Sequence, residues 1–310
     1  DTYGMDKNQI IVGNGAAELL YAICRLPGYT GAFVPAPGFS EYKEALEASN
    51  IPVRDIFYRP REDDNGKPYF EVPYLALETF AAELKGQDGR IIVFLGNPNN
   101  PDGTLLDKVH IRTVASMLKD ANSLLVIDES FIDFVDNEPL RDNDQSMRSL
   151  INEFDNIIIV HSFTKFYAVP GLRIGAAFGN EKLISQLHQY IPSWSVNTLA
   201  QAYTEAALND VNYIKRTKQE LNEERAFMYN ALDAIEGITV YPPSANFMLF
   251  KVNHEGITAN TINENLKRDN MIVRNCDSYV GLNNQWVRIA IKDHDTNIKL
   301  VEKLTDILKV

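Results

Sequence analysis

The sequence predicts an α/β protein with two domains: a large, three-layer domain around a mostly parallel β-sheet, and a smaller α+β domain. The first observation is the length of 310 residues, which exceeds that of one typical domain. The second is that short apolar runs alternate with longer amphipathic stretches, which is typical of crossover connections that place helices on both faces of a parallel sheet. These runs are GAFVP at Gly31, IIVFLG at Ile91, SLLVIDE at Ser123, NIIIVHS at Asn156 and RIGAAFG at Arg173.

The pattern changes at about Asp210, where a long charged helix is predicted to run to about Ile235. We therefore divide the chain into a large domain of residues 1–209 and a small C-terminal domain of residues 210–310. The small domain is expected to contain a final helix to Val310 and strands near Phe247–Lys251, Met271–Arg274 and Trp286–Ile291. The polar segment from Arg59 to Pro68 is expected to be a surface loop of the large domain.

The composition indicates a soluble, cytoplasmic protein that binds neither nucleic acid nor membranes. The net charge is -12 without long blocks of one sign, which argues against both kinds of anionic partner. Cys24 and Cys276 lie far apart and lack metal-ligand spacing, so we expect a reducing compartment, no disulfide framework and no metal. No apolar run approaches the roughly 20 residues of a membrane helix. The start, DTYGMDKNQ, is not a signal peptide, and it suggests that an upstream segment is absent from this sequence.

The most informative stretch, IIIVHSFTKFYAVPGLRIGAAF (Ile157–Phe178), places Lys165 just after an apolar strand and ahead of Arg173. A lone lysine is usually a solvated surface charge, but here apolar residues stand on both sides of it. A lysine removed from water has a lowered pKa and becomes a nucleophile for carbonyl groups. Lys165 is therefore the candidate catalytic residue, able to react with an aldehyde.

Two other segments follow apolar runs and carry candidate binding residues. GNGAAE (Gly13–Glu18) opens a helical pattern, and backbone amides at a helix start, such as those of Gly15, Ala16 and Ala17, can bind an anion. Glycines before helices are also commonly simple turns. In NPNNPDG (Asn97–Gly103), two prolines and a glycine make a rigid turn, from which an asparagine can donate to a ring oxygen. An ordinary turn is the alternative.

Single side chains add to this pattern. Asp128 ends the run LLVID, where a carboxylate is costly unless a cation or strong donor meets it; a protonated pyridine nitrogen, a helix cap or a salt bridge would each serve. Phe39 can stack on a flat ring, although an aromatic residue there is more often core. Arg274 and Arg288 lie at or within predicted strands, where they can clamp a carboxylate or form internal salt bridges.

Together these residues specify a cofactor with an aldehyde, a phosphate and a protonatable aromatic ring, which is pyridoxal 5′-phosphate (PLP). Lys165 can react with the aldehyde, Asp128 can pair with the ring nitrogen, and Asn100 can hydrogen-bond to the ring hydroxyl. The phosphate is served by the glycine-segment amides, Ser162, Thr164 and Arg173.

Five long stretches carry a resemblance to a known family. They are PGFSEYKEAL (Pro37–Leu46), DESFIDF (Asp128–Phe134), SFTKFYAVPGLRIG (Ser162–Gly175), WSVNTLAQ (Trp194–Gln201) and MIVRNCDSYVGLNNQWVRIAIK (Met271–Lys292). Over nearly its whole length the chain resembles the fold type I PLP-dependent enzymes of aminotransferase class I and II, which share an aspartate aminotransferase-like fold. Within that family it is most similar to L-threonine-O-3-phosphate decarboxylases of cobalamin biosynthesis, and next to histidinol-phosphate aminotransferases.

The resemblance implies a role for each matching residue. Lys165 would bind the cofactor's aldehyde, Asp128 its pyridinium, Asn100 its 3′-oxygen beside the substrate, and Phe39 would stack on its ring. Ala16, Ser162, Thr164 and Arg173 would bind its phosphate, Arg288 the substrate's α-carboxylate, and Arg274 the substrate's phosphate or carboxylate. The resemblance also implies a homodimer, a small phosphorylated amino acid as substrate, and an upstream family segment that reaches the partner subunit's phosphate site and is missing here.

Two residues depart from the family's patterns. Phe131 stands where histidinol-phosphate aminotransferases have a tyrosine, and phenylalanine there is similar to the decarboxylases. Asp102 replaces the usual threonine of an NNPTG turn, a change that the sequence does not explain.

The expected activity is decarboxylation of L-threonine O-3-phosphate to (R)-1-amino-2-propanol O-2-phosphate. The alternative enzyme is a histidinol-phosphate or related amino acid aminotransferase. A third alternative is a catalytically silent ligand-binding domain of a regulator, but such proteins usually carry a DNA-binding segment, and nothing basic or helix-turn-helix-like is visible.

Overall fold

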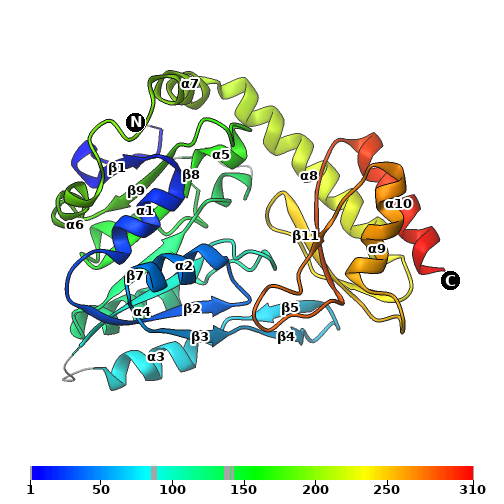
Figure 1. The fold of residues 1–310 in the computed structure, drawn as a ribbon, viewed down its shortest axis with the longest axis horizontal. Helices are drawn as coiled ribbons and strands as arrows, with labels where there is room; N and C mark the ends of the chain where they lie inside the picture. Colours follow the sequence, from blue (N-terminus) through cyan, green and yellow to red (C-terminus); the bar gives the residue numbers. More distant parts are fainter. Residues whose placement is uncertain (1, 85–88, 136–139, 141–142, 310) are drawn as a thin grey trace.

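The structure, a computed structural model, describes residues 2–84, 89–135, 140 and 143–309. A seven-stranded sheet with the order β1-β9-β8-β7-β6-β2-β3 forms its larger part (Figure 1). Neighbouring strands from β8 to β3 are parallel, whereas β9 is antiparallel to both of its neighbours. The predicted mostly parallel sheet is thus confirmed. The strands are β1 (Ile10–Gly13), β2 (Tyr29–Ala36), β3 (Val53–Phe57), β6 (Arg90–Gly96), β7 (Leu124–Asp128), β8 (Ile157–Ser162) and β9 (Gly175–Gly179).

The three layers follow from central strands that are apolar over most of their length. Successive side chains of a strand point to opposite faces, so a continuous apolar run must be covered on both sides. In β7, Leu124 and Val126 belong to a core shared with α1, α2 and α6, whereas Leu125 and Ile127 belong to a core shared with α3 and α4. These helices are α1 (Gly15–Cys24), α2 (Ser40–Ala48), α3 (Tyr74–Glu83), α4 (Lys108–Asp120) and α6 (Glu181–Leu187).

The reversed direction of β9 gathers the candidate residues at one edge of the sheet. Gly175, the first residue of β9, pairs with Ser162 at the end of β8 and with Gly13 at the end of β1. Asp128 ends β7, a parallel neighbour of β8. The chain therefore passes the same edge before α1, after β8 and before β9, which is where ligands bind in such sheets.

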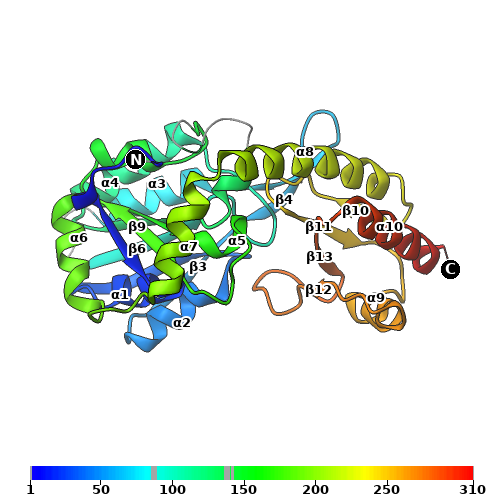
Figure 2. The same cartoon turned by 90° about the horizontal axis from the view of Figure 1, so that it is seen from above.

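A second, four-stranded antiparallel sheet follows in the order β10-β11-β13-β12. Figure 2 shows the long helix α8 running from the large sheet to this smaller one. The side chain of Asp210 accepts from the backbone of Tyr213 at 2.9 Å, which caps α8 after α7 has ended. The division into domains after residue 209 stays a prediction that coincides with this junction. The elements are α7 (Thr198–Asn209), α8 (Val211–Asp233), β10 (Ile238–Val240), β11 (Phe247–Val252), α9 (Ala259–Leu266), β12 (Arg274–Asn275), β13 (Trp286–Ala290) and α10 (His294–Leu308).

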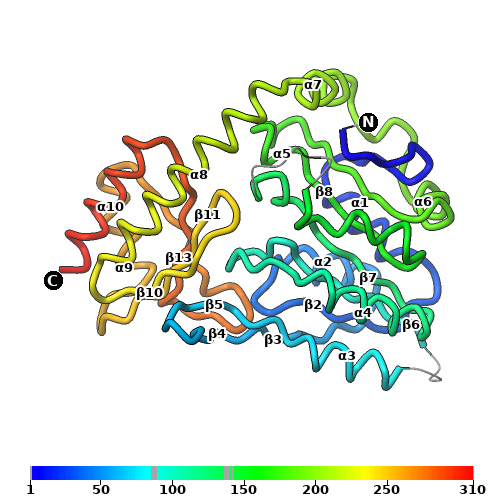
Figure 3. Tube along the Cα trace, turned by 180° about the vertical axis from the view of Figure 1, so that it is seen from behind, coloured from blue at the N-terminus to red at the C-terminus, as the bar shows by residue number. Residues whose placement is uncertain are grey.

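The segment predicted as a surface loop at Arg59–Pro68 contains strand residues, so that prediction is wrong in part. Strands β4 (Arg59–Glu62) and β5 (Pro68–Glu71) form an antiparallel hairpin beside the smaller sheet (Figure 3). Every side chain of β4 is exposed, which explains its loop-like composition. Phe70 of β5 is buried, with its ring centroid 5.0 Å from that of Tyr241 and 5.5 Å from that of Trp286. These aromatic contacts hold the hairpin in place.

Other differences are small. The strand predicted at Met271–Arg274 is limited to Arg274–Asn275, and β3 and β10 had no predicted counterpart. Within the described ranges, no helix is long and apolar enough to cross a membrane. The remaining short helices are α5 (Phe163–Phe166), η1 (Lys7–Gln9), η2 (Ile132–Phe134), η4 (Arg148–Asn152), η5 (His188–Tyr190) and η6 (Lys267–Asp269).

Candidate active site

An open cleft of about 690 Å³ lies at the carboxyl edge of the large sheet, and residues of the smaller sheet and its loops also line it. All of the predicted site residues except Gly15 line this cleft. The predicted residues that line it are Ala16, Ala17, Phe39, Asn100, Asp128, Ser162, Thr164, Lys165, Arg173, Arg274 and Arg288.

Gly15 lies directly behind the cleft and allows a close approach of Arg173. Its φ of +82° is a conformation that glycine adopts without strain. A Cβ on Gly15 would lie 2.5 Å from Nη2 of Arg173, and a Cβ on Gly175 would lie 2.6 Å from the backbone nitrogen of Ala16. The two glycines therefore bring a guanidinium group and the first amides of α1 together, a donor set that suits a phosphate.

Two hydroxyl groups add to these donors. Ser162 Oγ and Thr164 Oγ1 lie 2.7 Å apart, and both residues are buried. One hydroxyl donates to the other, so the proton of the second remains available to another acceptor. Arg173 has a φ of +56°, a left-handed conformation that costs a non-glycine residue on the order of 1 kcal/mol. Such strain is typical of functional sites.

Asp128 is 7% exposed and is held by two donors. Its Oδ2 accepts from the hydroxyl of Tyr42 at 2.8 Å, and its Oδ1 accepts from the backbone nitrogen of Ser130 at 2.9 Å. Burial, together with the charge of Asp128, raises the pKa of Tyr42 well above its usual value, so Tyr42 keeps the proton that it donates. Within the described chain no lysine or arginine forms an ion pair with Asp128. Its carboxylate can thus accept a further, cationic donor from the cleft.

Lys165 is exposed to the cleft, so the expected enclosure by apolar side chains is wrong. Its neighbours Phe163 and Phe166 are buried instead, which leaves Lys165 on the open side of the single turn α5. The pKa of Lys165 is nevertheless lowered, first because the cleft walls partly exclude water and then because Arg173 and Arg288 repel its charge. Asp128 opposes this effect. Nζ of Lys165 lies 5.8 Å from the ring centroid of Phe131.

Asn100 meets Arg288 and Tyr279 across the cleft. Nη1 of Arg288 donates to Oδ1 of Asn100 and, at 3.3 Å, to the hydroxyl of Tyr279, which itself donates to Oδ1 of Asn100 at 3.1 Å. Because an arginine can only donate, the amide oxygen of Asn100 must face Arg288. The amide nitrogen of Asn100 is then the donor on the opposite side.

Arg274 has different partners. Its Nη2 donates to Oγ of Ser278 at 3.0 Å, and its guanidinium carbon lies 5.7 Å from the ring centroid of Tyr279. In the part of the chain that the structure describes, no carboxylate forms an ion pair with Arg274 or Arg288. Internal salt bridges therefore do not account for these two arginines there.

Asp102, which the sequence left unexplained, closes the turn that carries Asn100. It is 5% exposed, and its carboxylate accepts from the backbone of Thr104 at 2.8 Å and from the side-chain amide of Asn99. Asn99 also donates to the carbonyl of Pro37 at 3.0 Å. Burial raises the pKa of Asp102 while these hydrogen bonds oppose the change. The aspartate thus supplies the acceptors that the turn needs.

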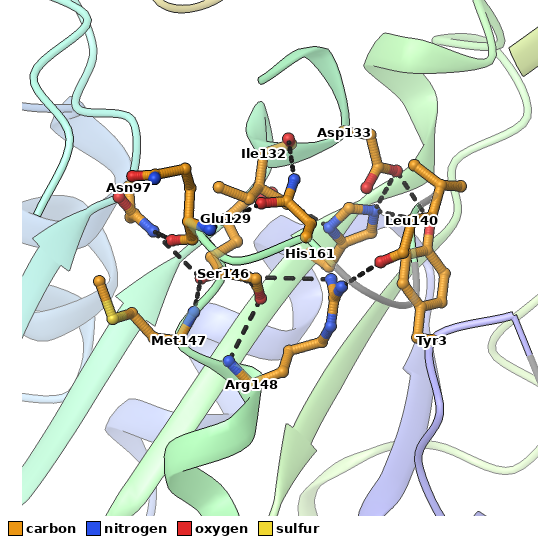
Figure 4. A network of polar contacts seen from close by, with 12 residues as sticks. Tyr3, Asn97, Glu129, Ile132, Asp133, Leu140, Ser146, Met147, Arg148 and His161 are labelled. Carbon is orange, nitrogen blue, oxygen red and sulfur yellow. Dashed lines mark hydrogen bonds and ion pairs between the residues drawn. The ribbon is translucent and has the colours of Figure 1, made fainter. Parts of the chain in front are cut away.

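A buried polar network, which the sequence did not reveal, lies behind the ends of β7 and β8 (Figure 4). The carboxylate of Glu129 accepts from Oγ of Ser146 and the backbone of Met147, both at 2.6 Å, and from the amide of Asn97 at 3.2 Å. These bonds fix the residue that follows Asp128, so they stabilise the end of β7.

His161, Asp133 and Tyr3 form the other half of this network. Nδ1 of His161 lies 3.0 Å from the carbonyl oxygen of Glu129, and Nε2 lies 3.0 Å from Oδ2 of Asp133, which also accepts from Tyr3 at 2.8 Å. Both ring nitrogens thus face oxygen atoms, and Nε2 can form an ion pair with the carboxylate of Asp133. Burial alone would raise the pKa of Asp133, but attraction and hydrogen bonding to His161, with help from Tyr3 and Arg148, lower it.

Tyr42, Tyr279 and this network are the site features that sequence reasoning missed. Tyr42 and Tyr279 stand inside the stretches that carried the family resemblance, but their hydrogen-bond partners, Asp128 and Asn100, lie far away in the sequence. His161 within an otherwise apolar strand was a usable signal, because a buried histidine needs polar partners.

Comparisons with known proteins identify the family of this chain. The family model for aminotransferase class I and II matches residues 2–304. The chain is 31% identical, over 98% of its length, to the adenosylcobalamin biosynthesis bifunctional protein CobDQ of Leptospira interrogans, of which it spans only 33%. It is also 31% identical, over 96% of its length, to the threonine-phosphate decarboxylase of Salmonella typhimurium, of which it spans 77%.

A solved structure is similar over most of both chains. The histidinol-phosphate aminotransferase from Clostridium acetobutylicum superimposes with a TM-score of 0.84 at 26% identity, covering 97% of this chain and 84% of that one. The predicted fold is confirmed by this likeness. The chain therefore belongs to the aminotransferase class I and II family, whose members are PLP-dependent enzymes.

Proposed function

We propose that this chain decarboxylates L-threonine O-3-phosphate, releasing carbon dioxide and (R)-1-amino-2-propanol O-2-phosphate. The observation that carries this choice is Phe131, whose ring lies beside Lys165 without offering a hydroxyl. The family resemblance associates a tyrosine at this position with histidinol-phosphate aminotransferases and a phenylalanine with the decarboxylases. The identity to the threonine-phosphate decarboxylase of Salmonella typhimurium supports the proposal.

The residues of the cleft fit the family's cofactor. The two glycines bring Arg173 and the amides of α1 together as a cradle that an added Cβ would fill, which suits a phosphate. Asp128 would pair with the ring nitrogen, the amide of Asn100 would donate to the ring oxygen, and Phe39, which lines the cleft, would contact the ring. When bound, PLP supplies an electron-accepting ring for the bond that breaks at the α-carbon of an amino acid.

The chain's own residues would hold the substrate and move its protons. Arg288 would bind the α-carboxylate and Arg274 the phosphate, while Nζ of Lys165, with its lowered pKa, would transfer a proton at the α-carbon. Which bond at the α-carbon breaks depends on how the arginines orient it. Loss of the carboxylate gives decarboxylation, and loss of the hydrogen leads to transamination.

Product analysis tests this proposal. We expect the holoenzyme to convert L-threonine O-3-phosphate to carbon dioxide and 1-amino-2-propanol phosphate. Turnover of histidinol phosphate with 2-oxoglutarate, and none of threonine phosphate, would contradict it and favour the aminotransferase alternative, which the likeness to the Clostridium acetobutylicum enzyme supports.

A variant tests whether the reaction depends on Lys165. A Lys165→Ala variant should lose both turnover and the visible absorbance of the bound cofactor, because Lys165 is the amine that the cofactor's aldehyde needs. Unchanged turnover in this variant would show that the reaction does not depend on Lys165.

We further propose that the protein acts as a homodimer in the cytoplasm. Support for the dimer comes from large apolar side chains exposed in and before α7, with exposures of 96% for Trp194, 74% for Leu199 and 45% for Tyr203. Grouped exposed apolar residues are typical of interfaces. Support for the compartment comes from Cys24 and Cys276, which are both free and buried.

A further inference from the structure

The two arginines of the small sheet stand directly opposite each other. Strands β12 and β13 pair antiparallel with Arg274 facing Arg288, so the two side chains leave the same face of the sheet as cross-strand neighbours. Like charges in this arrangement repel and destabilise the pair. The sheet alone would therefore leave the two guanidinium groups competing for the same anion or pushing each other away.

Tyr279 contacts both arginines, and each arginine also hydrogen-bonds to a different second residue. Its hydroxyl accepts from Arg288 at 3.3 Å and donates to Asn100 at 3.1 Å, which holds Arg288 on the side of Asn100. Its ring lies 5.7 Å from the guanidinium carbon of Arg274, close enough for a cation–π contact, and the adjacent Ser278 accepts from Arg274 at 3.0 Å. Arg288 is thus held by Asn100 and Arg274 by Ser278, while Tyr279 contacts both arginines.

The position of Tyr279 is itself well determined. Its backbone nitrogen donates to Cys276 at 3.1 Å, and its carbonyl accepts from Leu282 at 3.0 Å, so it sits within two successive tight turns. The next turn approaches the large sheet, because a Cβ on Gly281 would lie 3.7 Å from the ring of Phe57. Contacts from both sides of the cleft therefore fix this tyrosine before any ligand binds.

We infer that Tyr279 is a positioning residue that assigns the two arginines to two separate anionic groups of one substrate. Arg288, held at Asn100, receives the α-carboxylate, and Arg274, held at Ser278, receives the phosphate. The identity of these groups rests on the proposed function. The preference for a ligand with two anionic groups does not depend on which bond the enzyme breaks.

The test is calorimetric titration of the holoenzyme with two unreactive ligands that lack an amine. 3-Phosphoglycerate carries a carboxylate and a phosphate, whereas glycerate carries the carboxylate alone. For the unaltered protein we expect 3-phosphoglycerate to bind at least about tenfold more tightly, since charge-assisted hydrogen bonds to Arg274 are added.

Two variants separate the hydroxyl of Tyr279 from its ring. Tyr279→Phe keeps the ring at Arg274 and should weaken both ligands by about tenfold, leaving the ratio of their dissociation constants unchanged. Tyr279→Leu removes the ring as well and should lower that ratio several-fold, because Arg274 is no longer held apart from Arg288. Tyr69→Phe, in the exposed hairpin, is the matched control, and the visible absorbance and melting temperature of each variant verify cofactor binding and folding.

Three results would overturn the inference: equal affinity of the unaltered protein for the two ligands, wild-type affinities in both Tyr279 variants, or an unchanged ratio in Tyr279→Leu. None of these depends on turnover. If the enzyme transaminates instead of decarboxylating, the proposed function is wrong but the role of Tyr279 can still be correct. If the enzyme decarboxylates but the Tyr279 variants bind both ligands like the unaltered protein, the role of Tyr279 is wrong but the proposed function can still be correct.

Discussion

At the scale of single residues, the pKa of Lys165 depends first on partial burial in the cleft and then on the charges of its neighbours. Its side chain is exposed to the cleft, yet partial exclusion of water and the charges of Arg173 and Arg288 lower its pKa. The neutral amine, which is the reactive form, is thereby present at a lower pH than in an ordinary lysine.

The pH dependence of Lys165 follows with a definite sign. In the cofactor-free protein, acetylation of Lys165, followed by mass spectrometry, should rise with pH around a midpoint below 10.5, the ordinary lysine value. Asp128→Asn should move this midpoint further down, because the negative charge of Asp128 raises the pKa of Lys165. The other lysines serve as internal references. A midpoint at or above the ordinary value, or an upward shift in Asp128→Asn, would contradict this electrostatic account.

Gly15 offers a test of the phosphate cradle. Gly15→Ala forces a Cβ into a left-handed backbone and against Arg173, at 2.5 Å from its Nη2. We expect the dissociation constant for PLP to rise by at least about tenfold, which is about 1.4 kcal/mol, because the added Cβ displaces the guanidinium group that would donate to the phosphate. Absorbance titration measures it. Gly171→Ala is the control, because an added Cβ there meets nothing within 4 Å. Equal effects of the two changes would contradict the proposed cradle.

The site residues that could be predicted from sequence share one feature, which is that they stand at or after the end of an apolar run. Lys165, Asp128, Asn100 and Gly15 each follow an apolar run, and the structure brings them to one edge. The side chains that orient them could not be predicted in the same way. Tyr279 is separated from Asn100 by 179 positions, and only the folded chain brings the hydroxyl of one to the amide of the other.

At the scale of elements, the site depends on how β7 and β8 end. The antiparallel direction of β9, which brings Arg173 to the site, could not be predicted from an apolar run, because such a run does not encode direction. Nor does an exposed, charged strand such as β4 differ in composition from a loop. The polar network at His161 and Glu129 joins these strand ends and so links their stability to the geometry of the site.

The ion pair between Asp133 and His161 should contribute measurably to stability. Asp133→Asn keeps the shape but removes the charge, and since breaking a buried pair is expensive we expect a loss of about 3 kcal/mol at pH 7 in urea unfolding. The folded-state pKa of Asp133 is lowered, so this stabilisation is present above the ordinary aspartate value and is lost as the pH falls through the lowered one. The difference between the two proteins should therefore shrink in acid.

An exposed aspartate provides the control for this measurement. Asp64→Asn, in the hairpin turn, should leave the free energy of unfolding within about 0.5 kcal/mol of the unaltered protein. If Asp133→Asn were equally harmless, the stabilising contribution that we expect from the contact between Asp133 and His161 would be contradicted.

At the scale of the whole molecule, the proposed homodimer would bury the apolar surface at α7 that is exposed in the single chain. Light scattering should give twice the mass of one chain, and Trp194→Glu combined with Leu199→Glu should shift the protein toward monomer, because charged residues do not remain in an apolar interface. Leu75→Glu, at a residue 77% exposed on α3, is the matched control and should remain dimeric. A monomeric unaltered protein, or a dimer that tolerates both glutamates, would contradict this surface assignment.

The central claim is the reaction itself, and one measurement compares its two outcomes directly. The same preparation of holoenzyme is assayed for release of carbon dioxide from carboxyl-labelled L-threonine O-3-phosphate and for transfer of the amino group of histidinol phosphate to 2-oxoglutarate. We predict that kcat/KM for the decarboxylation exceeds that for the transfer by at least about 100-fold, a difference of roughly 2.7 kcal/mol in transition-state binding. Efficient amino transfer without release of labelled carbon dioxide would contradict the claim.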